Sequence, residues 1–158
     1  MSDAPLHLFL PSDADTARLG QWFAPRLRAG DVVALAGPIG AGKTHFARAL
    51  IQTRLGHAED VPSPSFTLVQ SYQAPDVELW HADLYRLTHP DEVLELGLDE
   101  AFETAICLVE WPERMGAALP ARALHLRLDS LGEGRQADIT LGGRPDLAPA
   151  LRQDWGVE

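Results

Sequence analysis

The sequence predicts a single α/β domain over residues 1–158, with a mixed, mostly parallel sheet, helices on both faces and antiparallel strands near the C-terminus. Three observations predict this fold class. Short apolar runs alternate with helix-like segments through the first 110 residues, the pattern of parallel strands joined by crossover helices. A glycine-rich loop joins the second apolar run to a helix. The length is that of one domain, and no repeat or linker divides the chain.

The first half of the chain should form two strands and two helices. Residues 6–10 read as a short strand, and Pro11 to Asp13 supply turn and N-cap residues for a helix over 14–28. The uniformly apolar run at 32–36 predicts a buried parallel strand. A helix over 45–55 follows the glycine-rich loop, and Gly56 is placed to end it.

Two prolines bar a helix in residues 61–67, so this segment should be a stiff, extended loop that runs into a strand. Its position suggests either a switch segment that senses a bound nucleotide or a rigid connection. Pro75 and Asp76 mark a turn. The other expected elements are strands at 66–72, 77–83, 105–110, 123–128 and 136–141, with 132–135 as the last turn, and helices at 89–97, 99–103 and 145–155.

Composition limits the possible functions. A net charge of −10 and the absence of a basic run argue against direct binding of nucleic acid, because such binding relies on Lys and Arg meeting phosphate. No apolar run approaches the roughly 18 residues needed to span a bilayer. The N-terminus does not resemble a signal peptide, and the single cysteine, Cys107, reads as a buried thiol. We therefore expect a cytoplasmic protein that does not contact a membrane.

The glycine-rich loop fits the phosphate-binding pattern G-x-x-x-x-G-K-[ST]. Its backbone N–H groups should hold the phosphates of ATP or ADP, Lys43 should reach the β- and γ-phosphates, and the Thr44 hydroxyl should bind Mg²⁺. Lys43 is the only lysine among 13 basic residues. The strand before the loop and the helix after it support a P-loop NTPase-like domain. The residues of the loop are Gly37, Pro38, Ile39, Gly40, Ala41, Gly42, Lys43 and Thr44.

Two carboxylates follow apolar strands and compete for a second role at the metal. Glu110 ends the more uniformly apolar strand and is the favoured ligand, while Asp83 would orient the attacking water or support the metal indirectly. Both are candidate catalytic residues beside Lys43. His81 is either a base or structural, and Trp111 either covers the phosphates, docks a partner or packs in the core.

Adenine recognition has no sharp motif, and Thr16 and Arg135 are predicted to contact the nucleotide from their positions alone. The absence of an N-K-x-D pattern disfavours a GTPase. An ATPase competes here with two alternatives. One is a P-loop kinase that phosphorylates a small molecule, and the other is a nucleotide-sensing module without useful turnover.

Four blocks together resemble the TsaE (YjeE) family: G-P-I-G-A-G-K-T, S-P-S-F-T-L-V, H-A-D-L-Y-R-L and L-V-E-W-P. The resemblance covers residues 6–142 and implies an ATPase needed for threonylcarbamoyladenosine modification of tRNA, with Glu110 as a further Mg²⁺ ligand. It also implies that Asp83 and Trp111 matter for activity. The implied partners are TsaB and TsaD, and ATP hydrolysis would reset their complex, so that tRNA is reached only indirectly. Ser65 and His45 depart from the residues expected there.

Overall fold

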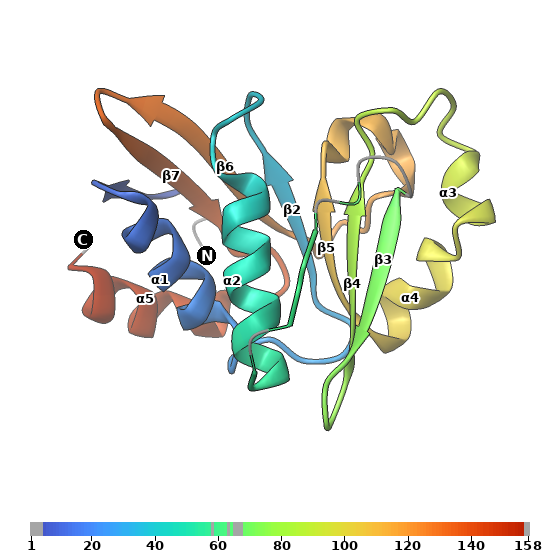
Figure 1. The fold of residues 1–158 in the computed structure, drawn as a ribbon, viewed down its shortest axis with the longest axis horizontal. Helices are drawn as coiled ribbons and strands as arrows, with labels where there is room; N and C mark the ends of the chain where they lie inside the picture. The colour runs from blue at the N-terminus through green and yellow to red at the C-terminus, as the bar shows by residue number, and fades with distance from the viewer. Residues whose placement is uncertain (1–4, 58, 63, 65–67, 157–158) are drawn as a thin grey trace.

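The computed structural model describes residues 5–57, 59–62, 64 and 68–156, and seven strands in this part of the chain form one sheet (Figure 1). The strand order is β1-β7-β6-β2-β5-β4-β3. The strands are β1 (Leu6–Leu10), β2 (Val32–Ala36), β3 (Val69–Gln73), β4 (Glu78–Asp83), β5 (Ile106–Glu110), β6 (Leu124–Leu131) and β7 (Gly134–Thr140).

Five α-helices accompany the sheet in the described residues. The helices are α1 (Asp13–Phe23), α2 (Lys43–Leu55), α3 (Glu92–Glu95), α4 (Leu98–Thr104) and α5 (Ala148–Trp155), and short 3₁₀ turns lie at Pro112–Arg114, Gly116–Ala118 and Pro145–Leu147.

The centre of the sheet is parallel. β2 pairs in parallel with both β5 and β6, and β4 pairs in parallel with β5. The pairs β3–β4, β6–β7 and β1–β7 are antiparallel. This arrangement confirms the predicted mixed sheet, and it brings the C-terminal ends of β2, β4 and β5 to one edge, where ligands bind in open α/β sheets.

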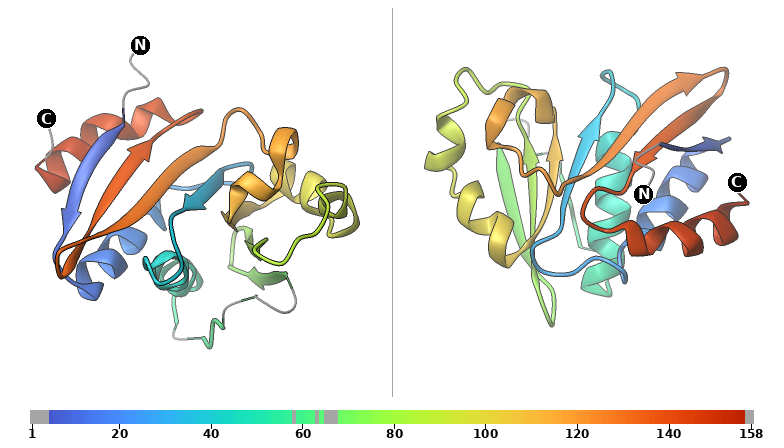
Figure 2. Two further views of the ribbon diagram at one scale, coloured as in Figure 1. Left: turned by 90° about the horizontal axis from the view of Figure 1, so that it is seen from above. Right: turned by 180° about the vertical axis from the view of Figure 1, so that it is seen from behind.

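Helices cover both faces of the sheet (Figures 1 and 2). On one face, Phe23 of α1 and Phe46 of α2 pack with Leu35 in one buried apolar cluster. On the other face, Phe102 of α4 belongs to a second cluster with Val109. Alternate residues of each central strand enter alternate clusters, as the period of a β-strand requires. Helix α5 packs beside α1, where the Trp22 indole Nε1 donates to Asp154 Oδ2 at 2.8 Å.

The helix predicted over 14–28 is shorter than expected. α1 ends at Phe23, and a turn follows, because Pro25 has no N–H to continue the helical hydrogen bonds. Helix α2 begins two residues earlier than predicted, at Lys43, directly behind Gly42. The final segment splits into a 3₁₀ turn and α5. β3 begins at Val69, and residues 66–67 of its predicted range lie outside the described residues.

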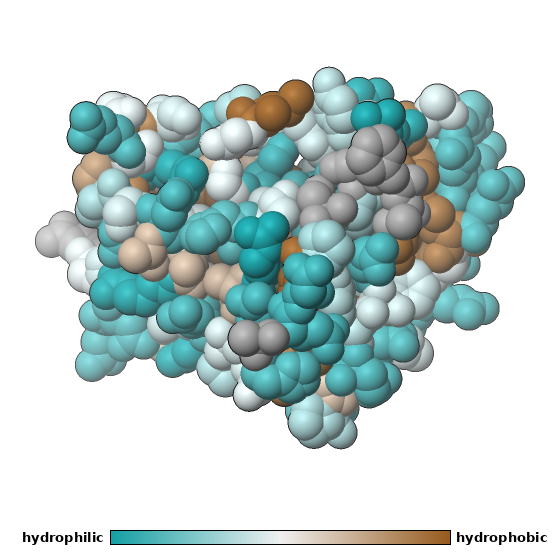
Figure 3. All heavy atoms as spheres, in the orientation of Figure 1, coloured by the Kyte–Doolittle hydropathy of each residue, from teal (hydrophilic) through white to brown (hydrophobic). Residues whose placement is uncertain are grey.

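No helix in the described ranges is long and apolar enough to cross a membrane. The face drawn in Figure 3 is mostly hydrophilic, with apolar residues in small groups.

Candidate active site

The phosphate loop is shaped by glycines at its two ends. Gly37 has a φ of 132°, and a Cβ there would lie 2.1 Å from the Leu128 carbonyl oxygen of β6. Gly42 has a φ of 100° and is the residue from which α2 starts. L-residues rarely adopt either conformation, and at Gly37 a side chain has no space. The loop therefore turns tightly from β2 into α2. The N-terminus of α2 then faces the space that the loop encloses.

Lys43 folds back over this loop. Its Nζ donates to the Gly37 carbonyl oxygen at 2.5 Å and lies 3.5 Å from the centre of the Trp111 ring. Burial lowers the pKa of the Lys43 ammonium, against the opposing effect of the nearby carboxylates Glu110, Glu113 and Asp83. The ammonium is thus largely buried and close to negative charge.

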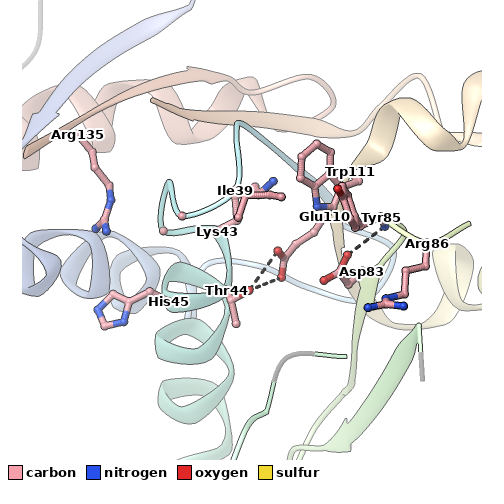
Figure 4. Close-up of a pocket in the computed structure, with 12 residues that line it drawn as sticks. Ile39, Lys43, Thr44, His45, Asp83, Tyr85, Arg86, Glu110, Trp111 and Arg135 are labelled. Atoms are coloured by element: carbon pink, nitrogen blue, oxygen red, sulfur yellow. Dashed lines mark hydrogen bonds between the residues drawn. The ribbon is translucent and has the colours of Figure 1, made fainter. Parts of the chain in front are cut away.

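The register of two parallel strands brings the carboxylates together. Asp83, at the end of β4, lies opposite Glu110, at the end of β5. The Thr44 hydroxyl of α2 donates to both carboxylate oxygens of Glu110, at 3.2 and 3.0 Å (Figure 4). The Asp83 carboxylate accepts a hydrogen bond from the Tyr85 backbone N–H at 3.1 Å.

His81 supplies a further contact to Glu110. It lies on the same face of β4 as Asp83, and its Nε2 is 2.6 Å from Glu110 Oε2. Both side chains are almost fully buried, with 0% and 3% exposure. A buried carboxylate costs free energy unless it is hydrogen-bonded. Thr44 and His81 together supply those hydrogen bonds.

Aromatic rings form one wall of the cavity. The Trp111 and Tyr85 rings lie 4.9 Å apart at 48°. Trp111 has a φ of 59° and a ψ of 52°, in the left-handed region, which is unfavourable for a bulky residue. Strain of this kind gathers at functional sites. The sequence marked Trp111 as a candidate but gave no signal that its ring would lie over Lys43, because that contact depends on the turn after β5.

Arg135 lies on the other side of the loop, as Figure 4 shows. Its Nη1 contacts Asp13 Oδ1 at 2.6 Å and donates to the Thr16 hydroxyl at 3.0 Å. A Cβ on Gly42 would lie 2.8 Å from the Arg135 guanidinium carbon, so Arg135 rests on the loop itself. Thr16 is fully buried behind Arg135. The structure thus brings the two residues together, and their roles toward a nucleotide stay predictions.

The cavity between these groups has a volume of about 460 Å³. Its wall includes two residues that the sequence did not single out as nucleotide-binding, namely His45 and Tyr85. The lining consists of Ile39, Gly40, Gly42, Lys43, Thr44, His45, Asp83, Tyr85, Arg86, Glu110, Trp111 and Arg135. Pro38 and Ala41 contribute to the loop from outside this lining, with Ala41 buried beneath it. Of the predicted switch segment, residues 63 and 65–67 lie outside the described residues.

The oxygen donors at the cavity fit Mg²⁺. No group of three or more His, Cys, Asp or Glu residues able to hold a metal occurs in the part of the chain that the structure describes. Mg²⁺ in nucleotide sites needs fewer protein ligands, because phosphates and waters complete its shell. The neighbouring hydroxyl of Thr44 and carboxylate of Glu110 are the hard oxygen donors that such an ion prefers.

Comparisons with known proteins agree with one another. A family model described as "Threonylcarbamoyl adenosine biosynthesis protein TsaE" matches residues 10–137. Among curated relatives, "tRNA threonylcarbamoyladenosine biosynthesis protein TsaE" of Rickettsia bellii is 36% identical over 127 residues, 80% of this chain and 88% of that protein. The protein of the same description from Treponema pallidum is 37% identical over 131 residues, which cover 82% and 95% of the two chains.

One solved structure has the same overall fold. "Crystal structure of Bacillus subtilus YdiB" matches with a TM-score of 0.79 and 28% sequence identity, covering 95% of each chain. The similarity thus extends over nearly the whole sheet and its helices.

Proposed function

Because this chain belongs to the TsaE family, we propose that it is the ATPase that serves threonylcarbamoyladenosine formation in tRNA. One observation carries the proposal: Lys43, Thr44, Asp83 and Glu110, from a loop and two strand ends, converge on one cavity. These are the groups that ATP hydrolysis needs, namely a cation and backbone donors for phosphate, oxygen ligands for Mg²⁺, and a carboxylate for water.

The phosphate loop would bind ATP or ADP through its backbone. The N–H groups of Gly37 and of Ile39 to Thr44, together with the N-terminus of α2, favour negative charge. Lys43 has three N–H donors, one of which contacts the Gly37 carbonyl oxygen. Phosphate oxygens would offer the ammonium stronger, charge-assisted hydrogen bonds than this carbonyl. The Trp111 ring shields the ammonium from water.

Thr44 and Glu110 would hold Mg²⁺. When bound, the ion would offset the negative charge of the phosphates. The protein's part is to keep a hydroxyl and a carboxylate side by side, which the hydrogen bonds of 3.0 and 3.2 Å support. The sequence left Asp83 as a competing ligand, and the hydrogen bonds from Thr44 to Glu110 favour Glu110 for this task.

Asp83 would orient the attacking water. Hydrolysis forms a bond between the water oxygen and the γ-phosphorus and breaks the bond to the β–γ bridging oxygen. Asp83 is 5% exposed and lines the cavity, and its carboxylate is fixed by the Tyr85 N–H. A carboxylate held in this way accepts a hydrogen bond from water without first changing its own position.

TsaB and TsaD would be the partners, with hydrolysis resetting their complex. The net charge of −10 agrees with a protein that reaches tRNA only through such partners. The descriptions of the curated relatives refer to tRNA modification, and the kinase alternative gains no support from them.

The rate of ATP hydrolysis by the Asp83→Asn variant tests the proposal. The rate of phosphate release, measured with TsaB and TsaD present, should fall about 10²- to 10⁴-fold. Affinity for ADP without Mg²⁺, measured by calorimetry, should stay unchanged, because Asp83 acts on the water. If the parent protein binds ATP but releases no phosphate under these conditions, it is a binding module. If TsaB and TsaD do not co-purify with it in the presence of ATP, the partner assignment is wrong.

A further inference from the structure

His81 is a fully buried polar group beside the cavity. It has 0% exposure and does not belong to the cavity lining, so it cannot reach a nucleotide or its attacking water. Glu110 contacts His81 on one side and Thr44 on the other. Any effect of His81 on the reaction must therefore pass through Glu110. This excludes the role of a general base, which the sequence left open for His81.

The hydrogen-bond partners of the imidazole identify its tautomer. Glu110 Oε2 lies 2.6 Å from Nε2, and an ionised carboxylate only accepts hydrogen bonds, so Nε2 carries the hydrogen. Nδ1 is buried and has no hydrogen-bond partner among the described residues. A proton there would be a buried donor left unsatisfied. Nε2 is therefore the donor, and the ring donates in one direction only, toward Glu110.

This contact fixes how Glu110 presents its oxygens. Within the described part of the chain, Oε2 accepts from both His81 and Thr44, whereas Oε1 accepts from Thr44. The imidazole is thus a second donor that restricts rotation of the carboxylate about its last side-chain bond. Groups that hydrogen-bond metal-binding carboxylates set the orientation of those ligands and so tune metal affinity.

We propose that His81 is a positioning residue, which orients the Glu110 carboxylate so that it binds Mg²⁺ together with Thr44. The inference rests on the proposed function, since it takes Glu110 as the metal ligand. It assigns to the histidine of the H-A-D segment a task in metal affinity rather than in proton transfer. His81 precedes Asp83 by two residues on the same strand face, so one strand serves both the metal and the water.

Two amide substitutions form a matched test. In His81→Gln the side-chain amide nitrogen takes about the position of Nε2 and still donates to Glu110. In His81→Asn the nitrogen takes about the position of Nδ1 and cannot reach it. Both variants bury one neutral amide, so a purely structural disturbance affects them alike. His81→Leu removes the donor altogether.

The readout is the Mg²⁺ concentration needed to tighten ADP binding, measured by calorimetry on the full chain, with ADP affinity in EDTA as the reference. His81→Asn and His81→Leu should need about 10- to 100-fold more Mg²⁺, with unchanged affinity in EDTA. His81→Gln should stay close to the parent. If His81→Leu does not fold, the Asn and Gln pair decides.

Equal Mg²⁺ requirements for His81→Asn, His81→Gln and the parent would overturn the inference while leaving the proposed function intact. A parent protein whose ADP binding ignores Mg²⁺ would overturn both. In a Glu110→Gln background, removal of His81 should have no further effect on the Mg²⁺ requirement, because the two residues act as a unit. An additive effect there would contradict a role through Glu110.

Discussion

The phosphate loop and the ends of β4 and β5 face the same cavity but depend on different parts of the structure. The loop is one continuous stretch, Gly37 to Thr44, and the backbone conformation of its own glycines determines its shape. The carboxylates come from separate strands, and only the pairing of Asp83 with Glu110 across a parallel ladder brings them together. The proposed phosphate contacts are thus encoded locally, whereas the proposed contacts to metal and water depend on strand register. A one-residue shift of β4 would turn both His81 and Asp83 to the other face.

A substitution at Gly37 tests whether the conformation of the loop depends only on its own residues. Of the substitutions considered, it should have the largest effect on stability. In Gly37→Ala the new Cβ would meet the Leu128 carbonyl oxygen at 2.1 Å, at a φ of 132°. Overpacking and a disfavoured φ together should lower the free energy of unfolding by about 3 kcal/mol, measured by urea denaturation.

Gly40→Ala is the matched control for this prediction. Its φ of 82° is also positive, but a Cβ there meets nothing within 4 Å. We expect a loss of only about 1 kcal/mol. Equal losses in the two variants would show that backbone conformation alone shapes the loop. The larger loss at Gly37 would show that β6 also supports the loop, so that even this region depends partly on the sheet.

The ADP affinities of Lys43→Ala and Glu110→Gln distinguish the role of the loop from that of the strand ends. Loss of charge-assisted hydrogen bonds to phosphate, worth about 1.5–3 kcal/mol, should weaken ADP binding about 10- to 150-fold even in EDTA. Glu110→Gln should leave ADP affinity in EDTA near that of the parent, since its contribution needs the metal. Calorimetry measures both. A loss of metal-free affinity in Glu110→Gln as large as that in Lys43→Ala would contradict the division between the regions.

The smallest expected effect is on the pH dependence of stability, which should link Lys43 of the loop to Glu110 of β5 through their charges. Burial lowers the pKa of Lys43 in the folded protein below its ordinary value of 10.5, and Glu110 partly opposes this. Between the lowered pKa and 10.5 the unfolded chain binds more protons, so stability without nucleotide should rise with pH through that window. Below the window both states are charged, and the cost of burying the ammonium is fully present.

Comparison with Lys43→Met isolates this contribution, because the variant lacks the titrating group and should lack its part of the rise. Cys107, whose pKa burial raises to about 12, acts in the opposite direction in both proteins. In Glu110→Gln the window should begin at a lower pH, because a carboxylate that favours the charged lysine is gone. The measurement is urea denaturation at several alkaline pH values. An unchanged window in Glu110→Gln would show that the two regions are not coupled through charge.

Some features of the protein followed from the sequence alone. The motif at Gly37 to Thr44 gave the loop, and the apolar runs at 32–36 and 105–110 gave two buried parallel strands. The overall mixed sheet with helices on both faces followed from the alternation of such runs. These features were accessible because backbone conformation at glycine and the burial of apolar runs depend mainly on neighbouring residues. The end of α1 at Phe23 also has a local cause, Pro25, but the predicted helix over 14–28 missed it.

Only the tertiary structure decided which polar groups meet. His81 contacts Glu110, Thr44 donates to Glu110, the Trp111 ring covers Lys43, and Arg135, which lines the cavity, contacts Thr16. Each contact joins residues far apart in the chain, and its geometry follows from strand order, register and the turn after β5. A sequence lists the donors and acceptors, but hydrogen bonds act over about 3 Å. Their pairing is therefore set by how the strands and helices pack, not by the order of residues.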